Sequence, residues 1–338
     1  MVVIQQPQLP PLWPLMKRRE WAAVGYLAAW KTVRFLPEPI GRKLFAAGAH
    51  YIVTRKADSA PIRQLRKNLA RVVGGAGHAA EPHSEALDTL VEQAVQSYAR
   101  YWYEVFAFDK LLATHGDHLV VDGIDNVDQS RGAVVTITHS GNWDMAGAAY
   151  VHAAGSFVTV TERLKPHELF DAFVAYRRSL GFTVLAHSKK DSADNATRSG
   201  AREKGTGESG NEKTPFEQLV DHINAGMAAI FPGERDLKGT GVVVDFFGEK
   251  ATFPAGPAAA AIRCGVPLHI GEVFFQGDRW CARISPPILV TDVEETTQRV
   301  AHEFEKTLRA HPADWHMLQP VWIADRTPRG GTPAQGGE

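Results

Sequence analysis

The stretch VVTITHSGNWD (134–144) places a histidine and an aspartate five residues apart. An apolar run ends at His139, the flexible step Ser140-Gly141 follows, and Asp144 falls in the first turn of a predicted helix. At such a junction the carboxylate can accept a hydrogen bond from one imidazole nitrogen, which leaves the other nitrogen free as a general base. The spacing favours a catalytic His139–Asp144 pair and leaves a buried structural hydrogen bond as the alternative.

The step after the histidine suits the same chemistry. Gly141 lets a ligand approach the backbone closely, and a helix N-terminus directs N–H groups toward negative charge. Ser140 does not fit a nucleophile elbow, because Thr138 and Asn142 stand where glycines are required. No spacing of His, Cys and Asp matches a known ligand set, so we expect no metal.

Other polar side chains follow two further predicted strands, near 157–161 and 227–231, the second after the step Pro232-Gly233. They are Glu162, Arg163, Glu234, Arg235 and Asp236. Ligands of open parallel sheets bind outside the carboxyl ends of the strands. If these strands are parallel neighbours of the strand that ends at His139, all of these side chains lie at one edge of the sheet. We therefore predict a single site at that edge.

Charge is distributed unevenly along the 338 residues. The first 80 residues carry thirteen Lys and Arg against three Asp and Glu, a net charge of +10, and the remaining 258 residues carry −11. Such asymmetry indicates an anionic partner, either a nucleic acid or a membrane. Motifs with stacking aromatic residues are absent, which disfavours nucleic acid. The two cysteines exclude a disulfide scaffold.

The segment KRREWAAVGYLAAWKTVRFL (17–36) favours a membrane. Its uninterrupted apolar run, Trp21 to Trp30, has about ten residues, half of what a bilayer-spanning helix needs. Aromatic side chains mixed with Lys and Arg suit a helix that lies on anionic lipid. The residues expected to contact the membrane are Lys17, Arg18, Arg19, Trp21, Trp30, Lys31 and Arg34. An ordinary amphipathic core helix and a targeting or spanning segment are the alternatives.

Composition divides the chain into regions. Residues 1–14, with four prolines, predict a flexible arm. Long runs within residues 15–110 lack turn signals, so this range predicts a helical region that contains the membrane-interface helix, and residues 111–326 predict an α/β core. Residues 188–214 and the tail 327–338 hold almost no apolar side chain that could pack, so we expect both to be disordered.

From about residue 118, short apolar strands alternate with helical stretches. The predicted strands lie near 118–122, 133–138, 157–161, 182–186, 227–231 and 267–274, and the predicted helices near 144–154, 167–180, 215–225 and 256–264. The alternation indicates an α/β fold with a central, mostly parallel β-sheet flanked by helices. Residues 273–284 predict a hairpin that turns at Gly277-Asp278. Thr291 and Glu294 predict a capping box before a last helix near 292–310.

HSGNWD (139–144) resembles the His-x4-Asp motif of the bacterial glycerolipid and lipid A acyltransferases. Three more blocks resemble the lipid A lauroyl/myristoyl group and stand in that group's order. They are RYWYEVF (100–106), FPGERDLKGTGVVVDFFGEKATFPAGPAAAA (231–261) and HPADWHMLQPVW (311–322). FPGERDL and DWHMLQPVW are most similar to the actinobacterial branch that acylates phosphatidylinositol mannosides. The insertion 188–214 is longer than that pattern has.

The resemblance implies transfer of a long acyl chain, of palmitoyl length, from acyl-CoA to the 6-hydroxyl of a mannose. The acceptor would be a phosphatidylinositol mono- or dimannoside. The resemblance also implies a peripheral protein on the anionic surface of the plasma membrane, at its cytoplasmic face, with no cofactor. A relative that acylates lipid A or another glycolipid from acyl carrier protein is one alternative. A non-catalytic peripheral lipid-binding protein is the other.

The same resemblance suggests roles for the polar residues. His139 would be the base, Asp144 would orient it, and Glu234 would contact His139 or the acceptor sugar. Arg177, Arg235 or backbone N–H groups at the junction would stabilise the oxyanion.

Binding residues complete the predicted site. Glu162 and Asp236 are the further expected substrate contacts. Small residues in 242–248 and 257–264 offer an acyl-chain groove, with plain core packing as the alternative.

Overall fold

The computed structural model describes residues 9–10, 12, 15–16, 20–75, 84–162, 167–187, 213–236 and 239–326, without the side chains of Ala22, Glu162, Ala186 and His187. Several predictions therefore concern residues outside the described ones. These are most of the arm 1–14, Lys17, Arg18, Arg19, Arg163, all but the last two residues of the insertion 188–214, and the tail 327–338.

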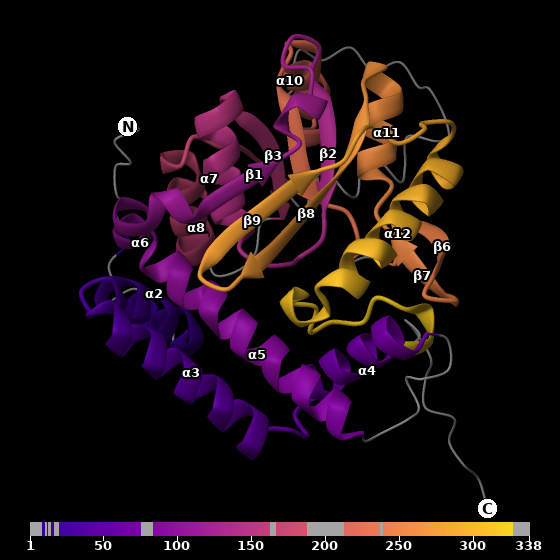
Figure 1. Ribbon diagram of the computed structural model, residues 1–338. Coiled ribbons are helices and arrows are strands. Elements are labelled where there is room, and N and C mark those ends of the chain that lie inside the picture. Colours follow the sequence, from indigo (N-terminus) through magenta and orange to yellow (C-terminus); the bar gives the residue numbers. More distant parts are fainter. Residues whose placement is uncertain are drawn as a thin grey trace, which may run out of the picture.

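The described residues form a central sheet of seven strands in the order β1-β9-β8-β2-β5-β3-β4 (Figure 1). The strands are β1 (Leu119–Asp122), β2 (Ala133–Ile137), β3 (Phe157–Glu162), β4 (Thr183–His187), β5 (Ala228–Pro232), β8 (Leu268–Gln276) and β9 (Arg279–Ile284). All neighbours pair in parallel except β8 and β9, which form an antiparallel hairpin that turns at residues 277–278. The mostly parallel sheet and the hairpin are both confirmed.

Helices cover both faces of the sheet. One face packs against α2 (Trp21–Val33), α6 (Phe108–His115), α7 (Trp143–Ala154), α8 (His167–Ser179) and the second half of α5 (Glu85–Phe106). The other packs against α4 (Ala60–Gly74), α10 (Pro215–Asn224), α11 (Gly256–Cys264), α12 (Val293–Ala310) and the first half of α5. Because both faces are covered, all five residues of β2 are buried, which explains its uninterrupted apolar sequence.

The helix predicted to lie on the membrane, α2, belongs largely to the core. Trp30 is 5% exposed, and its ring centroid lies 4.9 Å from that of Phe173 and 5.4 Å from that of Tyr176. The prediction that Trp30 contacts the membrane is therefore wrong, because α2 meets aromatic side chains of α5 and α8. Trp21, at the start of the helix, is 60% exposed. Within the described residues, no helix is both long and apolar enough to cross a bilayer.

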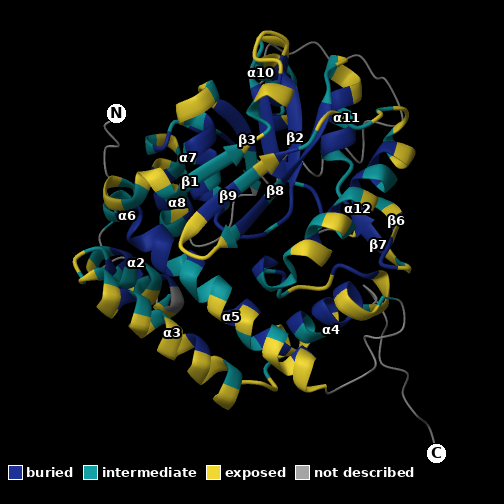
Figure 2. Ribbon diagram, in the orientation of Figure 1, coloured by how far each residue is buried: buried dark blue, intermediate teal, exposed yellow. Residues whose placement is uncertain are grey.

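The next helix, α3 (Glu38–Arg55), packs along α5 and is the most exposed of the amino-terminal helices (Figure 2). Its buried residues are Gly41 and Ala49. Ile40, Leu44 and Tyr51 follow one another at helical spacing, and each is more than half exposed. Solvent therefore reaches an apolar stripe on α3 that the sequence did not indicate.

The predicted acyl-chain groove is instead filled core. Residues 242–253 form the hairpin of β6 (Val242–Phe246) and β7 (Glu249–Phe253), a second, two-stranded sheet. Phe246 is fully buried there, and α11 packs its alanines into the same apolar cluster. The groove prediction is wrong for these segments, because their small and aromatic side chains pack against each other in the core, as its alternative stated.

The last long helix begins one residue later than its predicted cap implies. Asp292 is the N-cap of α12, and its carboxylate accepts from the main-chain N–H of Glu295 at 2.8 Å. Thr291 instead donates its hydroxyl to the Glu295 carboxylate. The predicted Thr291–Glu294 capping box is therefore wrong, although the helix itself is confirmed.

Candidate active site

The candidate site is built at the junction between β2 and α7, residues 138–144. Strand β5 runs parallel beside β2, with Ile137 opposite Pro232. The main-chain N–H of Gly233 continues the ladder by donating to the Ile137 carbonyl at 2.9 Å. His139 and Glu234, each two positions beyond this pair, are thereby brought together, as the shared sheet edge predicted.

A buried carboxylate holds the histidine. Nδ1 of His139 lies 2.9 Å from Oε1 of Glu234, and the main-chain N–H of His139 donates to the same oxygen at 2.6 Å. Burial alone would raise the pKa of the Glu234 carboxyl, but the His139 charge and these hydrogen bonds hold it below its usual value. The His139 side chain is 28% exposed. With Nδ1 engaged, Nε2 is the nitrogen left to exchange a proton with a substrate.

Asp144 serves a different partner from the one predicted. Its Oδ1 accepts from Nε of Arg177 and its Oδ2 from the hydroxyl of Tyr101, both at 3.0 Å. The prediction that Asp144 orients the imidazole is wrong in its pairing, because the first turn of α7 carries this side chain toward α5 and α8. The carboxylate on His139 is that of Glu234.

The ion pair between Asp144 and Arg177 fixes a positive charge at the α7 end of the junction. Burial would lower the pKa of Arg177, but the Asp144 charge outweighs it and keeps the guanidinium protonated. The guanidinium carbon lies 4.1 Å from the centre of the Trp143 ring. Both contacts hold Arg177 beside the start of α7.

A second buried carboxylate, Glu104 of α5, holds the turn between these ends. It accepts from Nδ2 of Asn142 at 2.7 Å, from Nε1 of Trp280 at 2.8 Å and from Nε of Arg100 at 2.6 Å. Asn142 in turn caps α7 by accepting from the main-chain N–H of Met145. The block RYWYEVF thus supports the whole junction, a role that sequence reasoning missed.

The carboxyl-terminal segment also pairs with the junction. We call residues 311–326, which follow α12, the C-terminal strap. The main-chain N–H of His316 donates to the His139 carbonyl at 2.8 Å, and that of Gly141 donates to the Asp314 carbonyl at 2.9 Å. Nε1 of Trp315 lies 3.3 Å from Oε1 of Glu234. Sequence reasoning missed Trp315, although the resemblance had singled out its block.

These contacts change the interpretation of Gly141. Its φ of +55° lies in the left-handed region, and a Cβ there would lie 2.9 Å from main-chain atoms of Val273 and Phe274. The close approach that requires glycine is to strand β8, so the prediction that Gly141 makes room for a ligand is wrong. The N–H groups of His139, Ser140 and Gly141 all donate to protein oxygens. These three amides are not free to form an oxyanion hole.

The structure gives different surroundings to the other residues that were predicted to bind substrate. Asp236 accepts from the main-chain N–H groups of Gly239 and Gly241 at 3.0 and 2.7 Å, so it closes its own loop. Arg235 is half-buried, and its charge acts on Tyr98. The Glu162 side chain lies outside the described atoms, although β3 brings its backbone to the predicted edge.

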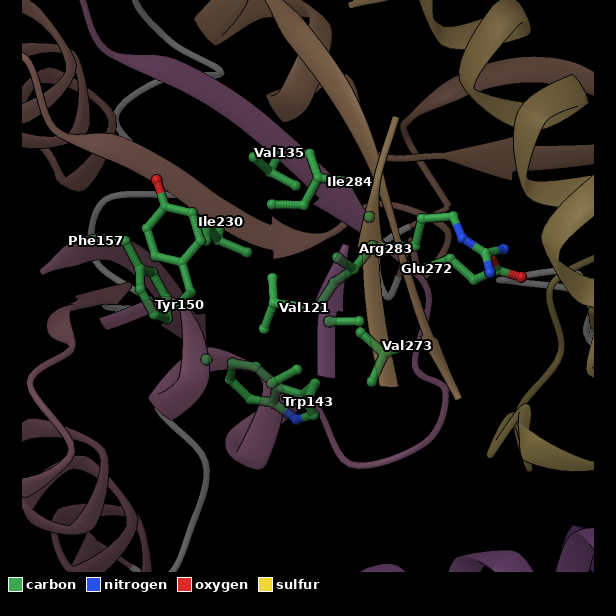
Figure 3. Close-up of a pocket in the computed structure, with 15 residues that line it drawn as sticks. Val121, Val135, Trp143, Tyr150, Phe157, Ile230, Glu272, Val273, Arg283 and Ile284 are labelled. Carbon is green, nitrogen blue, oxygen red and sulfur yellow. The ribbon is translucent and has the colours of Figure 1, made fainter. Parts of the chain in front are cut away.

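An apolar cavity lies between α7 and the sheet (Figure 3). Trp143 and Tyr150 line it from the helix, and Val121, Val135 and Ile284 line it from the sheet. The space between its walls, including its open side, is about 430 Å³. Since Trp143 also lies under Arg177, the cavity begins where the junction ends. A base, a fixed cation and an apolar cavity suit chemistry on an apolar acyl substrate.

Comparisons with known proteins show the family to which the chain is similar. The family model described as bacterial lipid A biosynthesis acyltransferase matches residues 12–323. The phosphatidylinositol mannoside acyltransferase of Mycolicibacterium smegmatis is 41% identical over 309 residues, which cover 89% of this chain and 91% of that protein. The phosphatidylinositol mannoside acyltransferase of Mycobacterium tuberculosis is 40% identical over 316 residues, which cover 90% and 89%.

Proposed function

Because the chain belongs to the bacterial lipid A biosynthesis acyltransferase family, we propose that it acylates phosphatidylinositol mannosides with His139 as the base. The observation that carries the chemistry is the His139 imidazole held through Nδ1 by the buried Glu234 carboxylate. A second observation favours this acceptor. Over about nine-tenths of its length, the chain is about 40% identical to two proteins named phosphatidylinositol mannoside acyltransferase.

The proposed reaction moves a palmitoyl group from acyl-CoA to the 6-hydroxyl of a mannose. Nε2 of His139 takes the hydroxyl proton as the sugar oxygen attacks the thioester carbonyl. The tetrahedral intermediate then expels the coenzyme A thiolate, which takes the proton from His139. Glu234 stabilises the imidazolium that forms between these steps. Every proton is returned, and the chain needs no covalent intermediate.

The negative oxygen of the tetrahedral intermediate needs a hydrogen-bond donor. The N–H groups of His139, Ser140 and Gly141 already bond protein oxygens, so the donor must be another group. Arg177 is a permanently charged candidate, because Asp144 and the Trp143 ring hold it at the start of α7. Arg235, which follows β5, is a second candidate. Glu162 and Asp236 stay predicted substrate contacts.

The apolar cavity under α7 is the proposed place for the acyl chain. Its walls are almost entirely apolar, and Trp143 links it to the junction. The 242–248 and 257–264 segments, proposed from sequence, are excluded by their packing. A bulky side chain in the cavity, such as Phe at Ala146, should lower turnover of long-chain donors more than that of short-chain donors.

The membrane partner is proposed on α3 as well as on the amino end of α2. Ile40, Leu44 and Tyr51 are exposed beside the exposed basic residues Lys43 and Arg55, a combination that suits an anionic lipid surface. Such docking would place the protein peripherally at the cytoplasmic face of the plasma membrane.

The residues in and next to α2 that the sequence predicted to contact the membrane fall into two groups. Lys31 donates to the Pro10 carbonyl at 2.8 Å. Arg34 lies over the ring of Phe35, which is 73% exposed. Trp21, Arg34 and Phe35 therefore extend the proposed surface. Lys17, Arg18 and Arg19 lie outside the described residues and stay predicted membrane contacts.

Vesicle binding tests the membrane proposal with a matched pair. Leu44→Glu should reduce co-sedimentation with anionic vesicles, whereas Val243→Glu should not. Leu44 on α3 and Val243 on β6 are equally exposed, at 57% and 56%. Equal binding by the two variants would reject α3 as the docking helix.

Acyl transfer tests the function itself. Wild-type protein should transfer palmitoyl from palmitoyl-CoA to a phosphatidylinositol mono- or dimannoside, and His139→Ala should lose at least 10³-fold in kcat. His302→Ala, on the exposed face of α12, is the control. Retained turnover by His139→Ala would reject the base. Preference for palmitoyl-acyl carrier protein and a lipid A precursor would favour the alternative donor and acceptor that the basic amino end also allows.

A further inference from the structure

The main chain of Trp315 lies directly opposite the catalytic junction. Ser140 and Trp315 form an antiparallel β-bridge, flanked by the hydrogen bonds of the strap to His139 and Gly141. The strap therefore acts as a short extra strand along the loop that follows β2. Any shift of Trp315 along this bridge would also move the backbone of His139.

The indole of the same residue contacts the other half of the pair. Oε1 of Glu234 accepts from the N–H and Nδ1 of His139 and from Nε1 of Trp315. Oε2 of Glu234 is buried and has no hydrogen-bond partner among the described residues. The hydrogen bonds that other described residues make to this carboxylate thus all reach Oε1, and among them Trp315 supplies the side-chain donor that does not belong to His139. A buried charge held so sparsely depends strongly on each donor.

The strap fixes the indole independently of Glu234. The Asp314 carboxylate accepts from the hydroxyl of Ser97 and from the main-chain N–H of Phe275, both at 2.8 Å. Asn68 of α4 donates to the carbonyls of Met317 and Gln319 at 2.8 and 3.0 Å. These anchors lie on both sides of Trp315. Its N–H is therefore a preset donor toward which the Glu234 side chain, on the loop after β5, must turn.

We propose that Trp315 is a positioning residue, whose indole N–H holds the Glu234 carboxylate in the orientation that holds His139 for proton transfer. The proposal rests on the proposed function, since it assigns a role in the same acyl transfer. Trp315 itself is fully buried, and its role is to act through Glu234. The expected consequence is a change in turnover without a change in substrate binding.

Trp322 offers a matched control within the same strap. Both tryptophans are fully buried, and the indole N–H of Trp322 donates to the Phe246 carbonyl at 2.9 Å, away from the catalytic pair. Replacing either with Phe removes one buried indole hydrogen bond and keeps an aromatic ring. Loss of packing should therefore be similar in the two variants, whereas loss of the Glu234 contact occurs in one.

Kinetics and thermal unfolding of both variants test the proposal. Trp315→Phe should lower kcat about tenfold and leave KM for donor and acceptor unchanged, because a hydrogen bond to a charged group is lost from the reacting pair. Trp322→Phe should lower the melting temperature by a similar amount and keep kcat within about twofold of wild type. Equal losses of kcat in the two variants, or wild-type kcat in Trp315→Phe, would overturn the assignment.

A second measurement separates this inference from the proposed function. In protein labelled with ¹⁵N-histidine, the ring signals of His139, assigned from His139→Gln, should shift in Trp315→Phe and stay in place in Trp322→Phe. Signals that do not move in Trp315→Phe, or that move equally in both, would reject the positioning role whatever the substrate. Absence of acyl transfer by wild-type protein would reject the proposed function alone.

Discussion

Two buried carboxylates stand at the two ends of one junction and differ in how fully they are satisfied. Glu234 and Asp144 are both fully buried. Both oxygens of Asp144 accept hydrogen bonds, from a permanent cation and from a phenol. Glu234 bonds a titratable histidine through one oxygen, and its other oxygen has no partner in the described part of the chain.

The difference supports the proposal that Glu234, and not Asp144, assists the proposed proton transfer. A carboxylate saturated by fixed donors gains little when charge moves nearby, so Asp144 suits a structural role toward Arg177. A carboxylate bonded to an imidazole changes its interaction each time the ring is protonated, so Glu234 suits catalysis. Replacing Glu234 should therefore affect mainly kcat, whereas replacing Asp144 should affect mainly the free energy of unfolding.

Replacing Glu234, the proposed catalytic carboxylate, should have the largest effect. Glu234→Gln should lower kcat by about 10³- to 10⁴-fold with little change in KM, because an amide cannot stabilise the imidazolium. Steady-state kinetics with palmitoyl-CoA would measure the change, and circular dichroism would verify the fold. Retention of more than a tenth of wild-type kcat would show that the two carboxylates do not differ as proposed.

Replacing the structural carboxylate should affect stability more than turnover. Asp144→Asn leaves the Arg177 charge buried without its counter-ion, and we expect the free energy of unfolding to fall by about 3 kcal/mol. kcat should fall about tenfold, since Arg177 and the start of α7 become less well placed. Denaturant unfolding and kinetics would measure both changes.

A double-mutant cycle sharpens this prediction. Arg177→Met in the Asp144→Asn background removes the uncompensated charge, so the double variant should lose less stability than the two single losses added together. Additive losses would mean that Asp144 and Arg177 act separately, and the structural role of Asp144 would be lost.

Acid unfolding provides a third way to separate the two groups. The folded-state pKa of Glu234 lies below its ordinary value of 4.5, so its contribution to stability is present above that value. The contribution is lost as the pH falls through the folded-state pKa. The difference in unfolding free energy between wild type and Glu234→Gln should therefore narrow as the pH falls below about 4.5. A constant difference across this range would contradict the pairing with His139.

The fold could be predicted closely because it depends on local periodicity. The six strands expected between 118 and 274 all form, and each boundary agrees to within two residues. Apolar runs that alternate with amphipathic helices leave few other architectures. The 242–253 hairpin was missed because its residues were assigned to a groove, and only the packing of Phe246 shows that they fill the core.

The location of the site could be predicted from the sequence, but the carboxylate that bonds His139 could not. The parallel edge brought His139 and Glu234 together as expected. Spacing then favoured Asp144 as the partner of His139, because the two are near in sequence. The contact with Glu234 depends on the register of β2 against β5, which pairs residues 95 positions apart and leaves no local signal.

The amino-terminal helices show the same limit. The α2 sequence fits a membrane surface and an aromatic core equally well, and the presence of Phe173 and Tyr176 opposite Trp30 decides for the core. A sequence gives the apolar face of a helix and not the surface that covers it.

The smallest expected effect tests the second donor to Asp144. Tyr101 is buried, and burial together with the Asp144 charge holds the pKa of its hydroxyl well above 10, so the hydroxyl stays a donor. Tyr101→Phe removes this hydrogen bond, and we expect a loss of about 1 kcal/mol in unfolding free energy and less than about threefold in kcat.

Tyr103, two residues along α5, is the matched control. Its hydroxyl is buried and has no hydrogen-bond partner among the described residues. Removing an unsatisfied buried hydroxyl costs nothing in hydrogen bonding, so Tyr103→Phe should be neutral or slightly stabilising in the same denaturant titration. If Tyr103→Phe lost as much stability as Tyr101→Phe, the packing of the hydroxyl oxygen, and not its hydrogen bond, would account for both losses. Asp144 would then be held by Arg177 alone, and its contrast with Glu234 would rest on that one ion pair.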